Sequence, residues 1–322
     1  MISQKCAIIE IGSNAVKYIV GRLNDDQLEI LKDESHVTKL AENSKLALNS
    51  EEKILAEESI DRTLKKIWSL HFDALVDMGV PYNNIKFVAT AALRGAKNRH
   101  SIEVEFEQIF HKNITVITEA EECNYALYGS RLGIKDNSEN FMVFDAGAGS
   151  TEFIFMEDYE VVANTSIPLG AQSIKEQYFN NDEERYTLPH LMQVCNVLKP
   201  EFRSFLDKFI KYINKSQICI GIGGGIISIR TIQQQIASCD FKVVHDTIIE
   251  FDSLHTLMYQ LSNKTNEERK TIVGLTPDRA DIIIPSICII YSALHAYNIK
   301  KIHVSNWGVR QAILFEELKY LV

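Results

Sequence analysis

The sequence has few cysteines, and no two of them are spaced as a pair. The six cysteines are scattered over 322 residues without a Cys-x-x-Cys motif. The spacing of a cysteine metal site is therefore absent, and we expect reduced, mostly buried thiols in a cytoplasmic protein. The first residues, M-I-S-Q-K-C, also lack the layout of a secretory signal peptide, so we expect no export.

Long apolar runs and an excess of positive charge are missing as well. The longest apolar region, residues 282–296, is interrupted by Pro285, Ser292 and His295. It is too short and too polar to cross a bilayer, and it predicts a core helix instead. The formal net charge is −9, which argues against nucleic acid as the main ligand. We therefore expect neither a membrane nor a nucleic-acid partner.

The sequence does contain a short apolar run followed by a glycine-rich turn, F-M-V-F-D-A-G-A-G-S-T-E-F, at residues 141–153. The apolar run predicts a buried strand. Gly147 lies in the turn, where glycines allow backbone N–H groups to converge on a phosphate. Ser150 and Thr151 add two hydroxyl groups. The pattern predicts a phosphate-binding loop, and a tight hairpin turn without a ligand is the alternative.

Two carboxylates flank this turn. Asp145 stands where the predicted strand ends, and Glu152 follows the two hydroxyl residues. Neither can pair with a phosphate directly, because the charges repel. They could instead hold a cation, or orient a water molecule, beside a phosphate that the loop binds.

A similar layout occurs near the N-terminus. Glu10 ends an apolar run and is followed by Gly12, Ser13 and Asn14, before a second strand pattern begins. Taken alone, this segment would be read as a plain hairpin. Its likeness to the turn at residues 141–153 indicates an internal duplication, in which two domains of similar topology clamp a phosphate between two turns.

Two further segments place polar groups at the start of helices. The glycine-rich residues 221–225 follow an apolar strand pattern and open a helix, whose N-terminus is a good anion site. Glu119, Glu121 and Glu122 fall in the first turn of another predicted helix. Alone, these glutamates would be read as partners of the helix dipole. The polar residues 135–140 make the strongest composition break between domains.

Each of these motifs is weak by itself, but together they have the order and spacing of one family. They are E-I-G-S-N from Glu10, T-A-A-L-R ending at Arg94, the pair Glu121 and Glu122, D-A-G-A-G-S-T-E from Asp145, P-L-G from Pro168, G-I-G-G from Gly221, and the segment from Ser305 to Arg310. The sequence resembles the exopolyphosphatase/guanosine-pentaphosphate phosphatase (Ppx/GppA) family over residues 7–314.

The resemblance implies an α/β protein with the actin-like ATPase fold, in which two ribonuclease-H-like domains surround a central cleft. Domain I would comprise residues 1–124 plus 305–322, and domain II residues 125–304. Shorter members of the family are often dimeric, so a homodimer is one state that the resemblance allows.

The resemblance also implies roles for individual residues. Glu122 falls on the catalytic glutamate that activates the attacking water. Asp145, Glu152 and Glu10 fall on carboxylates that organise Mg²⁺ or another divalent cation. The residues expected to contact phosphate are Ser13, Asn14, Arg94, Gly147, Ser150, Thr151, Gly223 and Gly224.

Several positions depart from the family pattern. Glu10 stands where aspartate is usual, and the extra methylene moves the carboxylate by about 1 Å, a misplacement that can cost roughly 10²-fold in rate. Ala148 replaces a glycine, and Gly225 replaces a threonine. Asn124 and Ser173 stand where arginines are common. These departures leave reduced activity open as an alternative.

Three functions remain after this reading. The first is a hydrolase that releases terminal orthophosphate from inorganic polyphosphate or from guanosine pentaphosphate. The second is a kinase or ATPase of the wider actin-like superfamily, against which no further nucleotide-binding element is found. The third is a weakly active sensor that binds polyphosphate or an alarmone. We favour the polyphosphate hydrolase.

Overall fold

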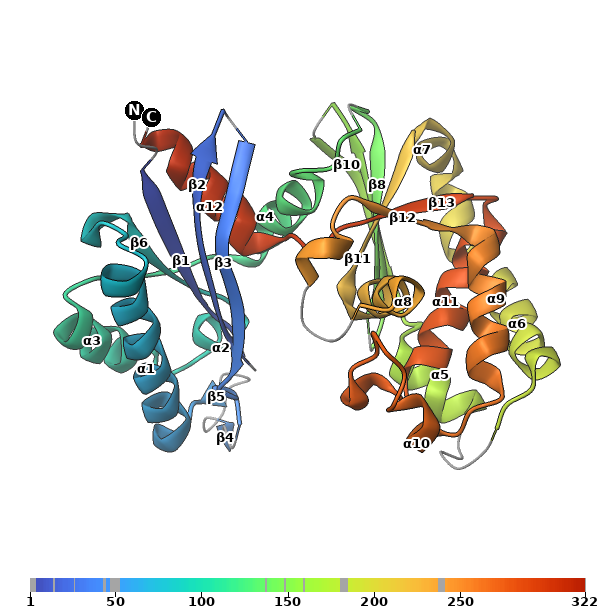
Figure 1. Ribbon diagram of the computed structural model, residues 1–322, viewed down its shortest axis with the longest axis horizontal. Helices are drawn as coiled ribbons and strands as arrows, with labels where there is room; N and C mark the ends of the chain where they lie inside the picture. Colours follow the sequence, from blue (N-terminus) through green and yellow to red (C-terminus); the bar gives the residue numbers. More distant parts are fainter. Residues whose placement is uncertain are drawn as a thin grey trace. The chain divides into compact units, whose positions relative to one another are not determined.

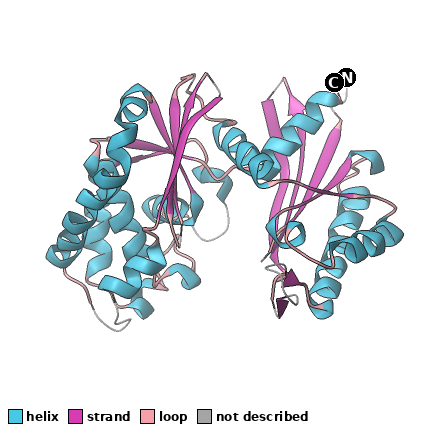
Figure 2. Cartoon of the chain, turned by 180° about the vertical axis from the view of Figure 1, so that it is seen from behind, coloured by secondary structure: helices cyan, strands magenta, loops and turns pink. Residues whose placement is uncertain are grey.

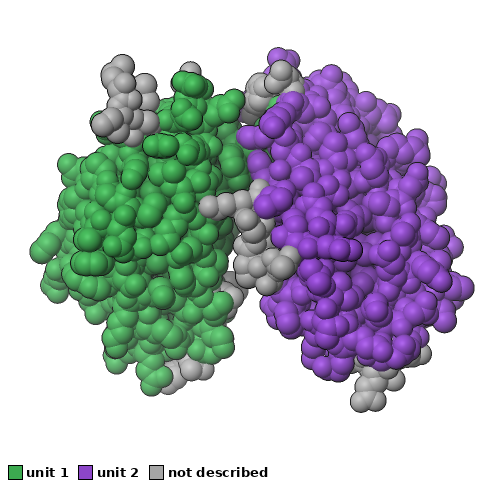
Figure 3. Space-filling model, in the orientation of Figure 1, with its two compact units in different colours: residues 1–132, 307–322 green, residues 133–306 purple. Residues whose placement is uncertain are grey.

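The computed structural model describes residues 4–13, 15–25, 27–42, 45–46, 53–136, 138–147, 149–158, 160–179, 185–236 and 241–321. Asn14 and Ala148 lie outside the described residues. The chain divides into two compact units, which Figure 3 colours separately: unit 1 is Met1–Leu132 with Trp307–Val322, and unit 2 is Gly133–Asn306. The boundary expected at residue 124 falls inside helix α4 (Glu119–Arg131), and the whole helix belongs to unit 1.

Unit 1 is built on a five-stranded sheet with the order β3-β2-β1-β6-β7. The first three strands are antiparallel, and β6 and β7 run parallel to β1. A separate two-stranded ribbon joins β4 to β5. The strands are β1 (Lys5–Ile11), β2 (Ala15–Asn24), β3 (Gln27–Val37), β4 (Lys45–Leu46), β5 (Lys53–Ile54), β6 (Ile85–Ala89) and β7 (Ile114–Val116).

Helices cover both faces of this sheet. Successive residues of a strand point to opposite sides, so one strand can contact the helices on both faces. Ile9 belongs to the apolar cluster that contains residues of α1 and α3, whereas Ile8 belongs to the cluster that contains residues of α12. Figure 1 shows these helices beside the sheet of unit 1. Both faces of β1 are therefore buried, as its unbroken apolar run predicts. The helices are α1 (Glu57–Phe72), its continuation η1 (Asp73–Asp77), η2 (Tyr82–Asn84), α2 (Ala91–Arg94), α3 (Arg99–Phe110), α4 and α12 (Val309–Tyr320).

Unit 2 contains a six-stranded sheet with the order β10-β9-β8-β11-β13-β12. Its strands β8, β9 and β10 are antiparallel, β11 and β13 continue parallel to β8, and β12 pairs antiparallel at the edge. The strands are β8 (Phe141–Ala146), β9 (Thr151–Glu157), β10 (Glu160–Ile167), β11 (Ile218–Ile222), β12 (Thr247–Glu250) and β13 (Lys301–Val304).

The helices of unit 2 are organised around α11 (Ile283–Ala296). Every residue of α11 except His295 is buried, and the helix packs against α5, α6, α8 and α9. This confirms the core helix predicted over residues 282–296. Figure 2 shows the helices of this unit in cyan beside its magenta sheet. The other helices are α5 (Ala171–Tyr178), α6 (Leu188–Leu206), η3 (Asp207–Phe209), α7 (Ile210–Lys215), α8 (Gly223–Gln234), η4 (Phe241–Val244), α9 (Phe251–Ser262), α10 (Asn266–Arg269) and η5 (Pro277–Arg279).

The two units repeat one topology, which confirms the predicted duplication. In each, an antiparallel three-stranded meander continues into two parallel strands on the side of its first strand. The first hairpin is closed by the same backbone hydrogen bond in both units. Gly12 N–H donates to Ala15 O at 3.0 Å, and Gly147 N–H donates to Ser150 O at 2.9 Å. The hairpin and the candidate phosphate loop are thus the same element.

No helix in the described part of the chain is long and apolar enough to cross a membrane.

Candidate active site

The candidate site of unit 2 lies where three strands reach the same level of the sheet. Asp145 on β8 is the register partner of Glu152 on β9 and of Ile222 on β11. Helix α8 begins at Gly223, directly after β11. The unpaired N–H groups at the start of this twelve-residue helix are therefore brought beside Asp145. Two carboxylates and a helix N-terminus, which the sequence presents as separate features, therefore meet at one edge of the sheet.

Asp145 is held in a confined position. Gly223 has a φ of +87°, and a Cβ at this residue would overlap Oδ1 of Asp145. Only glycine tolerates both the backbone conformation and the close approach. Burial raises the pKa of Asp145 to about 6, and the neighbouring Glu152 contributes to the same rise. The carboxylate is thus poorly solvated, and a cation beside it would offset that cost.

Glu152 is oriented by two hydroxyl groups. Ser150 Oγ and Ser166 Oγ, the latter at 2.9 Å, both donate to Oε1 of Glu152. The hydroxyl of Ser150, a predicted phosphate contact, is therefore engaged with this carboxylate.

The side chain of Thr151 points the opposite way from Glu152. It is fully buried, and its hydroxyl donates to Leu169 O at 2.6 Å. Because alternate residues of a strand face opposite sides of the sheet, Thr151 turns to the core when Glu152 turns to the site. The hydroxyl of Thr151, a predicted phosphate contact, is therefore engaged with the backbone of the core.

Arg279 is a site residue that sequence reasoning did not assign. Its guanidinium lies against Gly224 so closely that a Cβ there would overlap Nη1. No ion pair of Arg279 occurs within the described residues. A cation at the N-terminus of α8 adds to the positive potential of the helix end. The only signal in the sequence was its position two residues after Pro277, which opens the short helix η5.

The equivalent turn of unit 1 has a different charge. Glu10 on β1 is the register partner of Lys17 on β2, as Asp145 is of Glu152. Lys17 Nζ lies 2.9 Å from Glu10 Oε1, and the glutamate side chain is only 6% exposed. A carboxylate already neutralised by a lysine is a poor metal ligand, so the geometry does not favour the metal role expected for Glu10. Ser13 is exposed at the turn.

Unit 1 also brings together Arg94 and Glu122, which are remote in sequence. Arg94 ends α2, which follows β6, and Glu122 lies in the first turn of α4. Arg94 Nη1 donates to Glu122 Oε2 and to Ile117 O, each at 2.9 Å. The predicted phosphate ligand therefore orients the predicted catalytic glutamate.

Glu121 has a different role from Glu122. It closes a capping box, in which Thr118 N–H and the Thr118 hydroxyl donate to Glu121 Oε2 at 2.7 and 2.8 Å. These bonds lower the pKa of Glu121. The cap occupies this carboxylate and fixes the start of α4, and the neighbouring Glu122 turns about 100° away around the helix.

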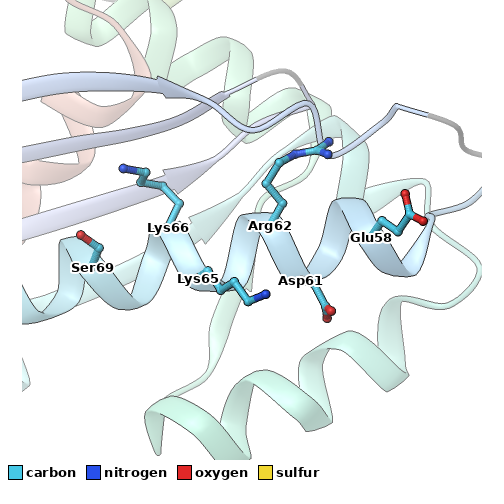
Figure 4. Close-up of a pocket in the computed structure, with 6 residues that line it drawn as sticks. All are labelled: Glu58, Asp61, Arg62, Lys65, Lys66 and Ser69. Atoms are coloured by element: carbon cyan, nitrogen blue, oxygen red, sulfur yellow. The ribbon is translucent and has the colours of Figure 1, made fainter.

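A shallow hollow on α1 lacks the features of a phosphate site. It is lined by Glu58, Asp61, Arg62, Lys65, Lys66 and Ser69 (Figure 4). Arg62 points toward the strands in this view and donates to Thr38 O at 2.6 Å and to Glu42 at 2.9 Å. The hollow contains no glycine turn, and this arginine is engaged by the protein itself.

The described residues include no group of three or more His, Cys, Asp or Glu side chains that could enclose a metal. Mg²⁺ does not need such a cage. It is usually held by one or two carboxylates, keeps several waters, and completes its shell with substrate phosphates. Asp145 and Glu152, side by side and poorly neutralised, fit that mode of binding.

The chain is similar to several known proteins over most of its length. The model of the Ppx/GppA phosphatase family matches residues 19–321. A guanosine-5'-triphosphate,3'-diphosphate pyrophosphatase of Pseudoalteromonas atlantica is 25% identical over 97% of this chain, which spans 58% of that protein. A putative exopolyphosphatase of Haemophilus influenzae is 24% identical over 97% of this chain and 91% of its own length.

Solved structures support the fold. The Aquifex aeolicus Ppx/GppA phosphatase superposes with a TM-score of 0.79 at 24% identity, covering 98% of this chain and 99% of the other. An exopolyphosphatase from Cytophaga hutchinsonii gives 0.69 at 21% identity, covering 98% of each chain. The actin-like fold that the family resemblance implies is thereby confirmed.

Proposed function

Because the chain belongs to the Ppx/GppA phosphatase family, we propose that it hydrolyses phosphoanhydrides and releases the terminal orthophosphate of inorganic polyphosphate. The observation that carries this proposal is the grouping of Asp145 and Glu152 beside the N-terminus of α8 and Arg279. Phosphoryl transfer needs positioning and charge neutralisation more than covalent chemistry. A site with both cation-holding and anion-holding groups suits that reaction.

In this proposal Asp145 and Glu152 hold a divalent cation, most simply Mg²⁺. When bound, the ion neutralises charge on the phosphate oxygens. The N–H groups at Gly223 and Gly224, the loop at Gly147 and the guanidinium of Arg279 bind the oxygens of the terminal phosphate. Ser150 and Ser166 keep Glu152 in the orientation that this task requires.

Glu122 is the proposed general base. It would accept the proton of the attacking water, a contribution of roughly 10²–10⁴-fold in rate. Arg94 orients its carboxylate through the hydrogen bond at 2.9 Å. Support comes from the different contacts of the two glutamates in α4. Glu121 forms the helix cap, whereas Glu122 takes no part in the cap and accepts a hydrogen bond from Arg94.

Guanosine pentaphosphate is the second candidate substrate. It is favoured by the name of the Pseudoalteromonas relative, of which this chain spans only 58%. The Haemophilus protein, of which the chain spans 91%, is named a putative exopolyphosphatase. The match in length therefore favours polyphosphate. The described cysteines are all free thiols, which suits the reducing cytoplasm.

One assay separates the candidates. Orthophosphate release would be measured with polyphosphate, guanosine pentaphosphate and ATP, with and without Mg²⁺. We expect metal-dependent release, fastest from polyphosphate. Faster release from ATP would indicate the nucleotide-hydrolase alternative, and tight polyphosphate binding without turnover would indicate a sensor.

A further inference from the structure

One end of unit 2 concentrates positive charge in an acidic chain. Residues 199–215 and 295–301 together contain seven Lys and Arg but only two Asp and Glu, whereas the whole chain carries a net charge of −9. Lys215 is paired with Glu157 at 3.0 Å. The remaining six cations define what we call the basic surface: Lys199, Arg203, Lys208, Lys211, Lys300 and Lys301.

The two segments form one surface although they are distant in sequence. Helices α6 and α11 pack side by side. Arg203 Nη2 donates to Ala296 O at 3.4 Å, and Tyr297 O–H donates to Asp207 at 2.9 Å. Figure 1 shows α7, the end of α11 and the start of β13 at the same end of this unit.

His295 marks the centre of the surface. Its Nε2 lies 3.5 Å from Lys199 Nζ. The pKa of His295 is lowered first by burial and then by Lys199, Arg203 and Lys300. Within the described residues none of these three cations forms an ion pair. A polyanion could therefore contact these cations without first breaking an ion pair, and it would displace solvent counterions.

We propose that the basic surface binds the internal phosphates of an inorganic polyphosphate chain whose end is hydrolysed in the loop of unit 2. This inference rests on the proposed function. Surface lysines act as mobile point charges on phosphate rather than as a shaped pocket, so they suit a linear chain with a charge on every unit.

The distance between the basic surface and the loop sets a minimum length for a polyphosphate chain that binds at both. Lys301 begins β13, and Val304 at its other end is the register partner of Gly221 in β11, just before the Gly223 turn. A four-residue strand is about 13 Å long. Only a chain of several phosphates can reach from one end to the other. Binding at both places would raise affinity through effective concentration.

Inorganic polyphosphate fits this surface better than single-stranded nucleic acid. Nucleic-acid channels use aromatic faces on which bases stack. The aromatic rings beside these lysines, Phe209 and Tyr212, stack on Phe155 with ring centroids 5.6 and 5.9 Å apart. Lys208 and Lys211 lie over the same two rings. These contacts engage the rings of Phe209 and Tyr212, so neither ring is free to stack on a base.

The test compares two triple variants of equal charge change in the full chain. The first is Lys199→Ala, Arg203→Ala and Lys300→Ala. The control is Lys65→Ala, Lys97→Ala and Lys319→Ala, three exposed lysines of unit 1. Equilibrium binding of long-chain polyphosphate would be measured at fixed ionic strength, together with kcat/KM for tripolyphosphate.

We expect the first variant to bind long chains roughly tenfold more weakly, with kcat/KM for tripolyphosphate unchanged, and the control to resemble the wild type. Wild-type affinity for long chains, or an equal loss with tripolyphosphate, would overturn the inference. So would single-stranded RNA that competes as well as polyphosphate. Because binding is measured without turnover, failure of the wild type to release orthophosphate is a separate result that concerns the proposed function.

Discussion

Arg94 and Glu122 form an ion pair with Nη1 and Oε2 2.9 Å apart, and both side chains are partly exposed, at 22% and 33%. A pair this accessible contributes about 0–1 kcal/mol to stability. A phosphate that offers Arg94 two oxygens could therefore replace the carboxylate at little cost. The pair keeps the glutamate oriented before substrate arrives.

Glu122→Gln should lower kcat by roughly 10²-fold or more with little change in KM, because the amide cannot accept a proton from water. Glu121→Gln is the matched control, since glutamine also closes a capping box, and it should leave kcat near the wild-type value. Equal losses in the two variants would show that α4 acts only as a support. Steady-state kinetics on polyphosphate measures both.

Arg94→Ala should lower kcat/KM, and the size of this loss should depend on whether Glu122 is present. If Arg94 orients the glutamate, its loss should matter less once Glu122→Gln is present, so that the two effects are not additive. A double-mutant cycle on kcat/KM measures this coupling. Strict additivity would mean that Arg94 acts on phosphate alone.

Asp145→Asn should abolish stimulation by Mg²⁺ and stabilise the metal-free protein near neutral pH. The pKa of Asp145 rises from its ordinary value of 3.8 to about 6 on folding, so the folded state binds this proton more tightly than the unfolded state. The contribution of Asp145 to metal-free stability therefore falls as the pH rises from about 4 to about 6 and stays lower above that range. Asparagine carries no charge and escapes this loss.

Thermal unfolding with EDTA and with Mg²⁺ checks this expectation. In EDTA, the Asp145→Asn variant should have a higher Tm than the wild type above pH 6 and the same Tm below pH 4. Mg²⁺ should raise the Tm of the wild type but not that of the variant. A variant that Mg²⁺ still stabilises as strongly as the wild type would contradict the metal role.

Glu10→Asp should keep or raise turnover. The shorter side chain no longer reaches Lys17, whose ammonium now lies 2.9 Å from the glutamate, and the freed lysine can contact phosphate. Lys17→Met in the Glu10→Asp background should then cancel any gain. A large fall in turnover for Glu10→Asp alone would show that the turn depends on the longer carboxylate.

Gly224→Ala should mainly raise KM, with only a small loss in the free energy of unfolding. The new methyl group would displace the guanidinium of Arg279, which is the flexible end of a side chain. Arg279→Ala should give a similar KM, and combining the two should add little. Gly223→Ala, at a φ of +87° and against Asp145, should instead cost folding stability, measured by denaturant unfolding.

Much of the fold could be predicted because it depends on local patterns. Apolar runs that end in glycine turns located β1 and β8, and the repeated layout indicated two sheets of like order. The sequence could not decide between a plain hairpin and a phosphate-binding loop, because the candidate phosphate loop is itself the turn of a hairpin. The domain boundary expected at residue 124 lies inside α4, which packs on α12 in unit 1, whereas the composition break at residues 135–140 lies closer to the division after Leu132.

The site was predicted less completely, since several of its contacts join segments that are distant in the chain. Arg279 reaches Gly224 through tertiary packing, and Lys17 reaches Glu10 through strand register. Thr151 was assigned by its hydroxyl, but strand alternation turns it to the core. Spacing within a motif shows which residues are near a turn, and only the register shows which way each side chain points.

The residue opposite the turn carboxylate on the next strand sets the charge of each turn. Lys17 occupies this position in unit 1 and Glu152 occupies it in unit 2. One turn therefore carries a neutral pair and the other a double negative charge, although the two backbones are alike. A cation is attracted to the second turn and not to the first, so the choice of ion depends on one cross-strand side chain rather than on the shape of the loop.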